Sequence, residues 1–597
     1  MVEWNVWPIL PAVLCPLARN RPSGRMGALM VINIDNPLIV QSDRTVLLEV
    51  DNPRYEDTRD QLARFAELEK SPEHIHTYRL SPLSLWNAAS AGLNADDILR
   101  TLEEFGKYPV PQNIRQEIIA SIARYGLIKL IRSQDDMLLI SEDPLALTEI
   151  WGSKTPRQYF IELTEHEGQT AIRVNPRMRG HVKQALIRIG FPVEDLAGYT
   201  EGDPLPMHLV EVAESGRPFA LRQYQREASE IFYAGGSVRG GSGVIVLPCG
   251  AGKTVVGMAT MAMVQTNTLI ICTSVTALNQ WMRELLDKTS LTPDQIGEYS
   301  SAKKEPKEVT LTTYQMLTYR KRKTEEFPHF EIFNRRNWGL IIYDEVHLLP
   351  APVFRITAEI QACRRLGLTA TLVREDHKED DVFTLIGPKR YDVPWKVLEK
   401  QGWIATAVCT EVRLPLPHDL RMKYATADGR AKFRIASENP LKMEVARRII
   451  QKHAGDLVLI IGQYLSQVKQ IAKEFDAPII TGATQNRKRE ELYRKFRDHE
   501  IHVLVVSKVG NFAVDLPDAN VAIQVSGTFG SRQEEAQRLG RILRPKQEGS
   551  MAHFYSLVTR DTRDQEFAAK RQLFLTEQGY SYEIHDAKIE ELQELPQ

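Results

Sequence analysis

The sequence predicts an α/β protein with two lobes built on parallel sheets, preceded by smaller N-terminal α+β domains. From residue 244 onward, short apolar and β-branched runs alternate with helical stretches, which is the pattern of buried parallel strands covered by helices. This alternation pauses between about Leu414 and Pro440 and then resumes, which indicates two lobes. The length of 597 residues supports several domains, because a single domain usually holds ~100–200 residues.

The composition is that of a globular protein of the reducing cytoplasm. Hydrophobic residues make up 43% and charged residues 26%, and the five cysteines lie far apart without a CxxC pair. That spacing argues against a disulfide framework or a zinc site. No apolar run reaches the ~18–20 residues of a membrane-spanning helix, so we expect no membrane partner. The net charge of −1 does not indicate nucleic acid, although basic residues gathered in one groove are compatible with it.

Residues 1–30 are predicted to be a disordered extension. Their apolar stretch is interrupted by Pro8 and Pro11 and has no basic leader before it, so it makes a poor secretory signal. The alternative is that natural translation starts at Met26 or Met30.

Residues 31–150 are predicted to form a helical, winged-helix-like domain. Such a module either contacts DNA or docks a partner, or it has a plain structural purpose, and the pattern alone favours the structural interpretation. The predicted elements are a strand at 43–50, helices at 55–68, 82–87, 95–105 and 113–125, and a β-hairpin made by 127–131 and 137–140.

Residues 157–210 are predicted to form a small α+β domain, with strands at 159–163 and 170–174 and a basic helix at 177–189. Pro204 and Pro206 end it.

Lobe one is assigned to residues 215–395 and lobe two to 396–575. An acidic tail, 576–597, is expected to be a solvated terminal helix, with a docking element as the alternative. The predicted strands are 244–247, 269–272, 340–343 and 366–368 in lobe one, and 457–461, 503–506 and 521–525 in lobe two.

A glycine-rich loop follows the first strand of lobe one and precedes a helix. Its residues are Pro248-Cys249-Gly250-Ala251-Gly252-Lys253-Thr254. Glycines let backbone N–H groups surround phosphate oxygens, and the helix N-terminus adds positive potential. Lys253 would reach the outer phosphates of ATP, and the Thr254 hydroxyl would bind Mg²⁺. Leu247 replaces the first glycine of the GxxxxGK[ST] pattern, so a chance glycine turn is the alternative, but the flanking strand and helix favour phosphate binding.

An acidic pair follows another strand of lobe one, in the string Asp344-Glu345-Val346-His347. Asp344 at the strand end can hold Mg²⁺, and Glu345 can orient or deprotonate the attacking water. Alone, such a pair is as often a solvated loop start. Together with the glycine loop it predicts ATP hydrolysis.

Lobe two contains an arginine-rich string, Gln537 to Arg544. Arg541 and Arg544 lie three residues apart, so they share one face of a helix. Arginines from a second lobe can neutralise charge on the transferring phosphoryl group and contribute roughly 10³–10⁵ in rate. A solvated basic face is the alternative, but the ATP site predicted in lobe one favours the catalytic interpretation. Hydrolysis that needs both lobes would couple chemistry to their opening and closing.

These motifs in this order resemble those of superfamily 2 helicases with RecA-like lobes, and specifically the XPB family. The resemblance extends over roughly residues 37–558 and is closer to the prokaryotic members. It is carried by strings that begin with LRQYQ at Leu221 and LPCGAGKT at Leu247, then CTS (272–274), TTY (312–314), DEVH (344–347), LGLTATLVRED (366–376), IGPK (386–389), SKVG to DLP (507–517) and SRQEEAQRLGR (531–541).

The resemblance implies a 3′→5′ ATP-dependent DNA helicase of prokaryotic cytoplasm, associated with the nucleoid and active in DNA repair, with ATP and Mg²⁺ as cofactors. It implies a damage-recognition-like role for 157–210 and a thumb-like insertion at 415–440 with five basic residues. It assigns adenine contacts to Arg222 and Gln225, further nucleotide contacts to Asp515 and Gln537, coupling of hydrolysis to DNA to Thr371, and DNA contacts to Thr273 and Thr313. It assigns strand separation to Arg374, Glu375 and Asp376, which without the family are a charged loop. The basic residues of the insertion would grip phosphates, with a solvated charged face as the alternative; they are Arg421, Lys423, Arg430, Lys432 and Arg434.

Three alternatives stay open on the sequence. The protein can be a duplex DNA translocase that unwinds poorly, or an ATP-gated scaffold that delivers a partner nuclease, and RNA is not excluded as a substrate. The intact Lys253, Asp344, Glu345, Arg541 and Arg544 argue against a pure scaffold, because a retired ATPase commonly loses one such residue.

Overall fold

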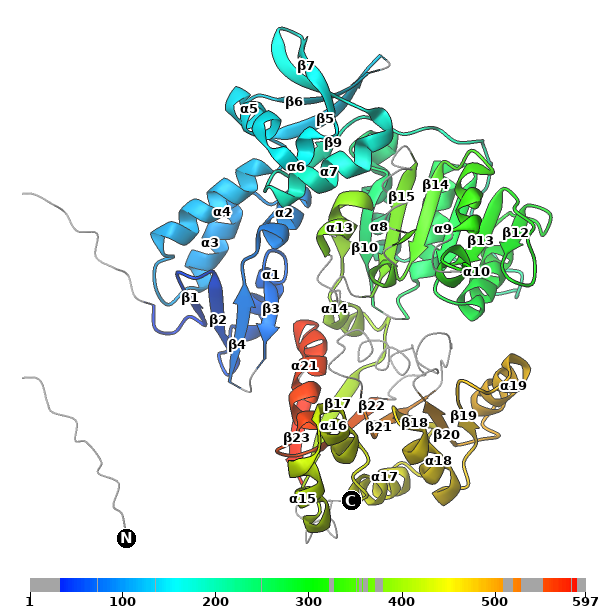
Figure 1. Ribbon diagram of the computed structural model, residues 1–597. Coiled ribbons are helices and arrows are strands. Elements are labelled where there is room, and N and C mark those ends of the chain that lie inside the picture. Colours follow the sequence, from blue (N-terminus) through cyan, green and yellow to red (C-terminus); the bar gives the residue numbers. More distant parts are fainter. Residues whose placement is uncertain are drawn as a thin grey trace, which may run out of the picture.

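A computed structural model describes residues 33–587, apart from 72–73, 135, 249, 322–326, 350–351, 354–356, 358–362, 371–378, 508–518, 528–550 and 581. In this described part the strands form four sheets, two of seven strands, one of five and one of four (Figure 1). Within it, no helix is long and apolar enough to cross a membrane.

Lobe one is a seven-stranded sheet whose paired strands all run parallel, which confirms the predicted architecture. Its strands β10 and β11 are mostly apolar and buried at every residue. In sheet order the strands are β12 (Ile296–Tyr299), β13 (Val309–Thr313), β11 (Thr268–Cys272), β14 (Leu340–Asp344), β15 (Arg364–Thr369), β10 (Ser242–Val246) and β16 (Lys389–Asp392). The helices that matter for the site are α8 (Gln223–Tyr233), α9 (Lys253–Val264) and α10 (Val275–Lys288).

Lobe two repeats the parallel arrangement in a second seven-stranded sheet. In sheet order its strands are β19 (Ile479–Ile480), β20 (Val503–Ser507), β18 (Val458–Gly462), β21 (Val521–Gln524), β22 (Ala552–Thr559), β17 (Ala407–Leu414) and β23 (Tyr582–Asp586). Helices α17 (Leu441–Lys452) and α18 (Leu465–Glu474) belong to this lobe, and the predicted insertion contains α15 (His418–Thr426) and α16 (Gly429–Ser437).

The prediction of a solvated helix in the acidic tail is wrong for its first part. Residues 582–586 form β23, which pairs in parallel with β17 at the edge of the lobe-two sheet. An edge strand leaves its acidic side chains in solvent, so its charge does not oppose strand formation. The preceding helix, α21 (Arg563–Glu577), ends where the tail was predicted to begin, and residues 588–597 lie outside the described part.

The N-terminal domain is a four-stranded antiparallel sheet in the order β1-β2-β4-β3, with four helices. The predicted helix at 55–68 stops early, because the chain turns after α1 and Leu68 is buried in β3 instead. The elements are β1 (Leu38–Val40), β2 (Thr45–Glu49), α1 (Tyr55–Leu62), β3 (Glu67–Lys70), β4 (Ile75–Arg79), α2 (Pro82–Ser90), α3 (Ala95–Phe105) and α4 (Gln112–Arg124).

The winged-helix-like assignment is wrong, and with it the boundary drawn at residue 150. The predicted hairpin, β5 (Ile128–Ser133) and β6 (Asp136–Ser141), pairs with later strands in one five-stranded sheet. Leu139 of β6 and Ile172 of β8 are paired and buried in the same core, so the hairpin is held by the next domain. The other elements of this small domain are α5 (Pro144–Gly152), α6 (Lys154–Arg157), β7 (Phe160–His166), β8 (Gln169–Val174), α7 (Arg179–Arg188) and β9 (Val193–Asp195).

The N-terminal domain contacts both lobes (Figure 1). On one side, Trp86 of α2 packs with Ile187 of α7 and with Phe383 of α13 (Glu379–Leu385) in lobe one. On the other side, Leu573 of α21 is buried in the core of the N-terminal domain itself. The two lobes are therefore joined by this domain as well as by the chain between them.

A buried ion network fastens α21 to lobe two. Lys442 Nζ lies 2.6 Å from Asp564 Oδ2 and also donates to the carbonyl of Val525 at 3.0 Å. The side chains of Lys442 and Asp564 are fully buried, and Arg571 lies 3.9 Å from the other carboxylate oxygen.

Replacing Asp564 should destabilise the protein strongly. Asp564→Ala leaves the fully buried Lys442 without its anion, and we expect the free energy of unfolding to fall by about 3–5 kcal/mol. Denaturant unfolding followed by circular dichroism measures this. Glu142→Ala, which removes an exposed partner of Lys129, should change stability by less than about 1 kcal/mol. Equal effects of the two substitutions would contradict the assigned role of the buried network.

Candidate active site

The glycine loop lies between β10 and α9, as predicted. Gly250 and Gly252 both have φ of +82°, a backbone region that side chains strain to enter. A Cβ at Gly252 would also lie 2.6 Å from Gln225 Nε2, so the loop has no room for one. Gly252 caps α9 without a side chain, which leaves the first amides of the helix without a side-chain acceptor. This backbone forms a cradle that a larger residue at Gly252 would fill.

The acidic pair converges on this loop. Lys253 Nζ lies 3.3 Å from Glu345 Oε1, and both side chains are largely buried, at 12% and 17% exposed. Lys253 opens α9 and Asp344 ends β14, and both lie at the carboxyl edge of the same parallel sheet. The structure therefore brings together the lysine and the two acids that the sequence placed in separate motifs.

The two carboxylates have different electrostatic surroundings. Burial, and then the charge of Glu345, raise the pKa of Asp344 to about 6. Burial also acts to raise the pKa of Glu345, but Lys253 and then His347 outweigh it and hold that pKa below its usual value. Glu345 is thus kept ionised, while Asp344 carries a charge that its surroundings disfavour above about pH 6.

Two residues that sequence reasoning missed orient these acids. Trp281 of α10 donates from Nε1 to Asp344 Oδ2 at 3.1 Å. His347 Nδ1 lies 2.7 Å from the Thr369 hydroxyl and 3.5 Å from Glu345 Oε2, so it connects the acid to the end of β15. Within the described part of the chain, Glu345 Oε2 is buried without a hydrogen bond. Such an oxygen is available to a water molecule or another donor.

The predicted adenine-side residues are held against the glycine loop. Gln225 accepts from the backbone N–H of Arg222 at 3.0 Å and donates to the Ala251 carbonyl at 2.9 Å. Tyr224, which sequence reasoning passed over, donates to the same carbonyl at 2.6 Å and accepts from Arg222 at 3.1 Å. The motif therefore fixes the carbonyl between the two loop glycines.

The predicted DNA-contacting threonines lie on neighbouring strand ends. Thr313 pairs with Cys272, directly before Thr273, in the parallel ladder of β11 and β13. The Thr313 hydroxyl is buried and caps the short helix α11 (Tyr314–Leu317) by accepting from Met316 N at 3.1 Å. Their DNA contacts stay predictions.

Several predicted site residues lie outside the described residues, and their roles stay predictions. They are Thr371, Arg374, Glu375, Asp376, Asp515, Gln537, Arg541 and Arg544.

The predicted insertion at 415–440 lies within the described part of the chain. None of the residues of its helix α15 is buried. Arg421, Lys423 and Arg430 are exposed on α15 and α16. The basic side chains of this helical pair are thus accessible to a partner.

Comparison with known proteins places these features in a family. Three family models match: "ERCC3/RAD25/XPB C-terminal helicase" over residues 398–596, "Helicase conserved C-terminal domain" over 38–165, and "Type III restriction enzyme, res subunit" over 218–374. The second match includes the β5–β6 hairpin together with the four-stranded domain before it.

Relatives match over almost the whole chain. A "DNA 3′-5′ helicase XPB" of Kineococcus radiotolerans is 53% identical over 93% of this chain and 97% of its own length. The Mycobacterium tuberculosis protein of the same name is 52% identical, over 93% and 98%. A "General transcription and DNA repair factor IIH helicase/translocase subunit XPB" of Enterocytozoon bieneusi is 33% identical over 92% of each chain.

The raised pKa of Asp344 predicts an unusual dependence of stability on pH. A carboxyl whose pKa is raised by folding, from 3.8 to about 6, destabilises the metal-free fold above pH 6. That cost fades as the pH falls from 6 towards 4. Asp344→Asn, measured in the presence of a chelator, should therefore be more stable than the parent at pH 8 by about 3 kcal/mol and unfold at a higher temperature. The gain should shrink at pH 4.5.

Asp294→Asn, an exposed acid of the same lobe, is the matched control and should show no such gain. An Asp344→Asn protein that is no more stable than the parent at pH 8 would contradict the assigned electrostatics.

Proposed function

Because the chain belongs to the XPB family of superfamily 2 DNA helicases, we propose that it uses ATP hydrolysis to move 3′→5′ on DNA and separate its strands in DNA repair. The observation that carries this proposal is the meeting of Lys253, Glu345 and Asp344 beside the glycine cradle. A duplex translocase that unwinds poorly is the close alternative, and the names of the bacterial relatives favour the helicase.

The residues present fit ATP and Mg²⁺. The cradle of Gly250, Ala251 and Gly252 would hold the phosphates, with Lys253 against the outer ones. The Thr254 hydroxyl and the Asp344 carboxylate would hold Mg²⁺, since this cation prefers oxygen ligands and usually takes only one or two from a protein. When bound, Mg²⁺ neutralises charge on the phosphates.

Glu345 is the proposed base that orients and deprotonates the attacking water. Its ionised state is supported by Lys253, and its second oxygen is buried without a hydrogen bond among the described residues. We further propose that Arg541 and Arg544 approach the outer phosphate from lobe two, so that hydrolysis requires the lobes to close. Asp515 and Gln537 would contact the nucleotide from the same lobe.

On the DNA side, we propose that Thr273 and Thr313 contact the backbone and that Thr371 links hydrolysis to it. Arg374, Glu375 and Asp376 would separate the strands, and the basic residues of α15 and α16 would grip phosphates without reading sequence. A partner nuclease and association with the nucleoid are further predictions from the family resemblance, tested by co-purification with and without nuclease treatment of the DNA.

ATP turnover with different nucleic acids tests the proposed function. We expect hydrolysis to be low alone and to rise at least tenfold with DNA, with a smaller rise for RNA. Displacement should occur from a duplex with a 3′ tail and not from one with a 5′ tail. Displacement of a triplex strand without unwinding of the tailed duplex would instead establish the translocase, and turnover indifferent to DNA would contradict both.

The Glu345→Gln variant should bind ATP and hydrolyse it 10²–10⁴-fold more slowly, because it loses the base while keeping the shape of the side chain. Single-turnover hydrolysis and equilibrium ATP binding measure the two effects separately. Glu331→Gln changes an exposed glutamate of lobe one and should leave both unchanged. If Glu345→Gln hydrolyses ATP as fast as the parent protein, Glu345 is not the base.

A further inference from the structure

An arginine of lobe one and a tryptophan of the interlobe linker are stacked beside the candidate site. The guanidinium carbon of Arg222 lies 4.3 Å from the centre of the Trp403 ring. Arg222 immediately precedes α8 in lobe one, whereas Trp403 lies between α14 (Trp395–Lys400) and the first strand of lobe two. The indole is 37% exposed, although large aromatic side chains are usually more deeply buried.

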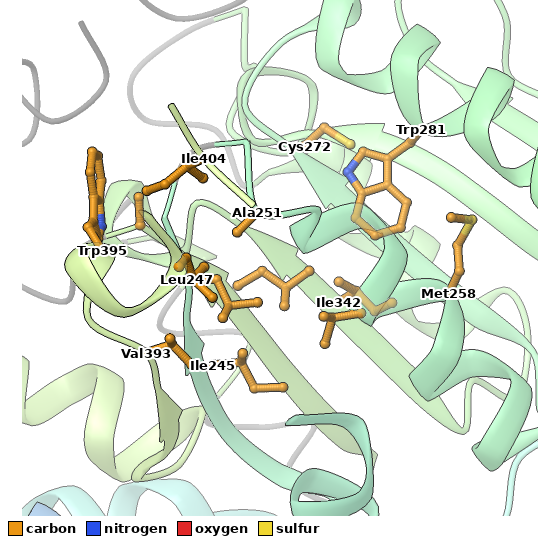
Figure 2. Packing of buried hydrophobic residues seen from close by; sticks show 14 of the residues in the cluster. Ile245, Leu247, Ala251, Met258, Cys272, Trp281, Ile342, Val393, Trp395 and Ile404 are labelled. Carbon is orange, nitrogen blue, oxygen red and sulfur yellow. The ribbon is translucent and has the colours of Figure 1, made fainter. Parts of the chain in front are cut away.

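The stacked pair is tied to the glycine loop on both sides. Arg222 donates to Tyr224, and Tyr224 donates to the carbonyl of Ala251 within the loop. From the linker, Ile404 directly after Trp403 is buried in the same core as Ala251 (Figure 2). The partly exposed indole is therefore held beside the cradle where the phosphates of a nucleotide would lie.

The backbone around Trp403 fixes its direction. The Trp403 amide donates to the Leu398 carbonyl at 2.9 Å, which closes the turn after α14. Gly402 supplies the φ of +74° that this turn needs. Because the backbone and the stacked guanidinium already restrict the ring, little further conformational entropy is lost when a ligand stacks on it.

We propose that Trp403 is the stacking platform for the base of the bound nucleotide, with Arg222 as its polar companion. This inference rests on the proposed function and names the element of that site which selects a purine. A flat indole beside a guanidinium offers a large π surface to a base, and the larger purine ring covers more of it than a pyrimidine does. Because Trp403 leads into lobe two, the base would also contact the segment that changes when the lobes close.

The alternative for this pair is a plain structural fastening of the linker. A fastening would affect stability or turnover whatever base the nucleotide carries. A stacking platform would affect binding, and for purine nucleotides above all. The two are therefore separated by binding affinity for ATP and for CTP.

The experiment compares the full-length parent with Trp403→Ala and Trp403→Phe. Equilibrium binding of ATP and of CTP is measured by calorimetry, and KM and kcat for DNA-stimulated turnover are measured beside it. For Trp403→Ala we expect ATP to bind about tenfold more weakly, CTP binding to change by less than twofold, and KM to rise while kcat stays within twofold. Trp403→Phe keeps a stacking ring and should recover most of the affinity.

Tyr108→Ala removes an exposed aromatic side chain of the N-terminal domain and should change none of these values. Unchanged ATP affinity in Trp403→Ala would overturn the inference, and so would an equal loss for ATP and CTP or a fall in kcat alone. A parent that binds ATP with the predicted dependence on Trp403 but shows no DNA-stimulated hydrolysis would leave the platform standing and contradict the proposed function instead.

Discussion

Parallel pairing of β10, β15 and β14 is the constraint on which the candidate site depends. Val246 pairs with Thr369, and Leu368 pairs with Asp344, so the three strands reach their carboxyl ends at one level. The glycine loop follows β10 and Glu345 follows β14 at this edge, so no single segment contains the whole site. Ligands of open parallel sheets bind at this edge for the same geometric reason.

The acids at this edge are kept in unequal states by their neighbours. Lys253 and His347 support the charge of Glu345, whereas Asp344 has the Trp281 N–H on one oxygen and a second carboxylate beside it. Burying two adjacent carboxylates is unfavourable without a compensating cation. Because these two carboxylates repel each other, a cation that binds beside them would relieve part of that unfavourable free energy.

The local sequence pattern predicted most strands and helices and the motifs that contain Lys253 and Asp344. It failed where a residue contacts another that is distant in the sequence. A buried apolar run such as β18, or the motif around Lys253, can be recognised from a few consecutive residues. The contact of Trp281 with Asp344 cannot, because Trp281 has the helical spacing of an ordinary core residue. The β5–β6 hairpin was predicted correctly as a hairpin, but nothing local says that β8 and β9 complete its sheet. The early end of α1 has the same origin, since β4 provides the ladder that draws the chain around Leu68 out of the helix.

The burial of Leu573 within the N-terminal domain has a mechanical consequence. One hydrophobic centre contains side chains from the beginning and the end of the chain, while Trp86 attaches the same domain to lobe one. Rotation of one lobe against the other must then strain or break an apolar contact at one end of this brace. The N-terminal domain therefore couples the two lobes, and a change in their relative orientation has to include it.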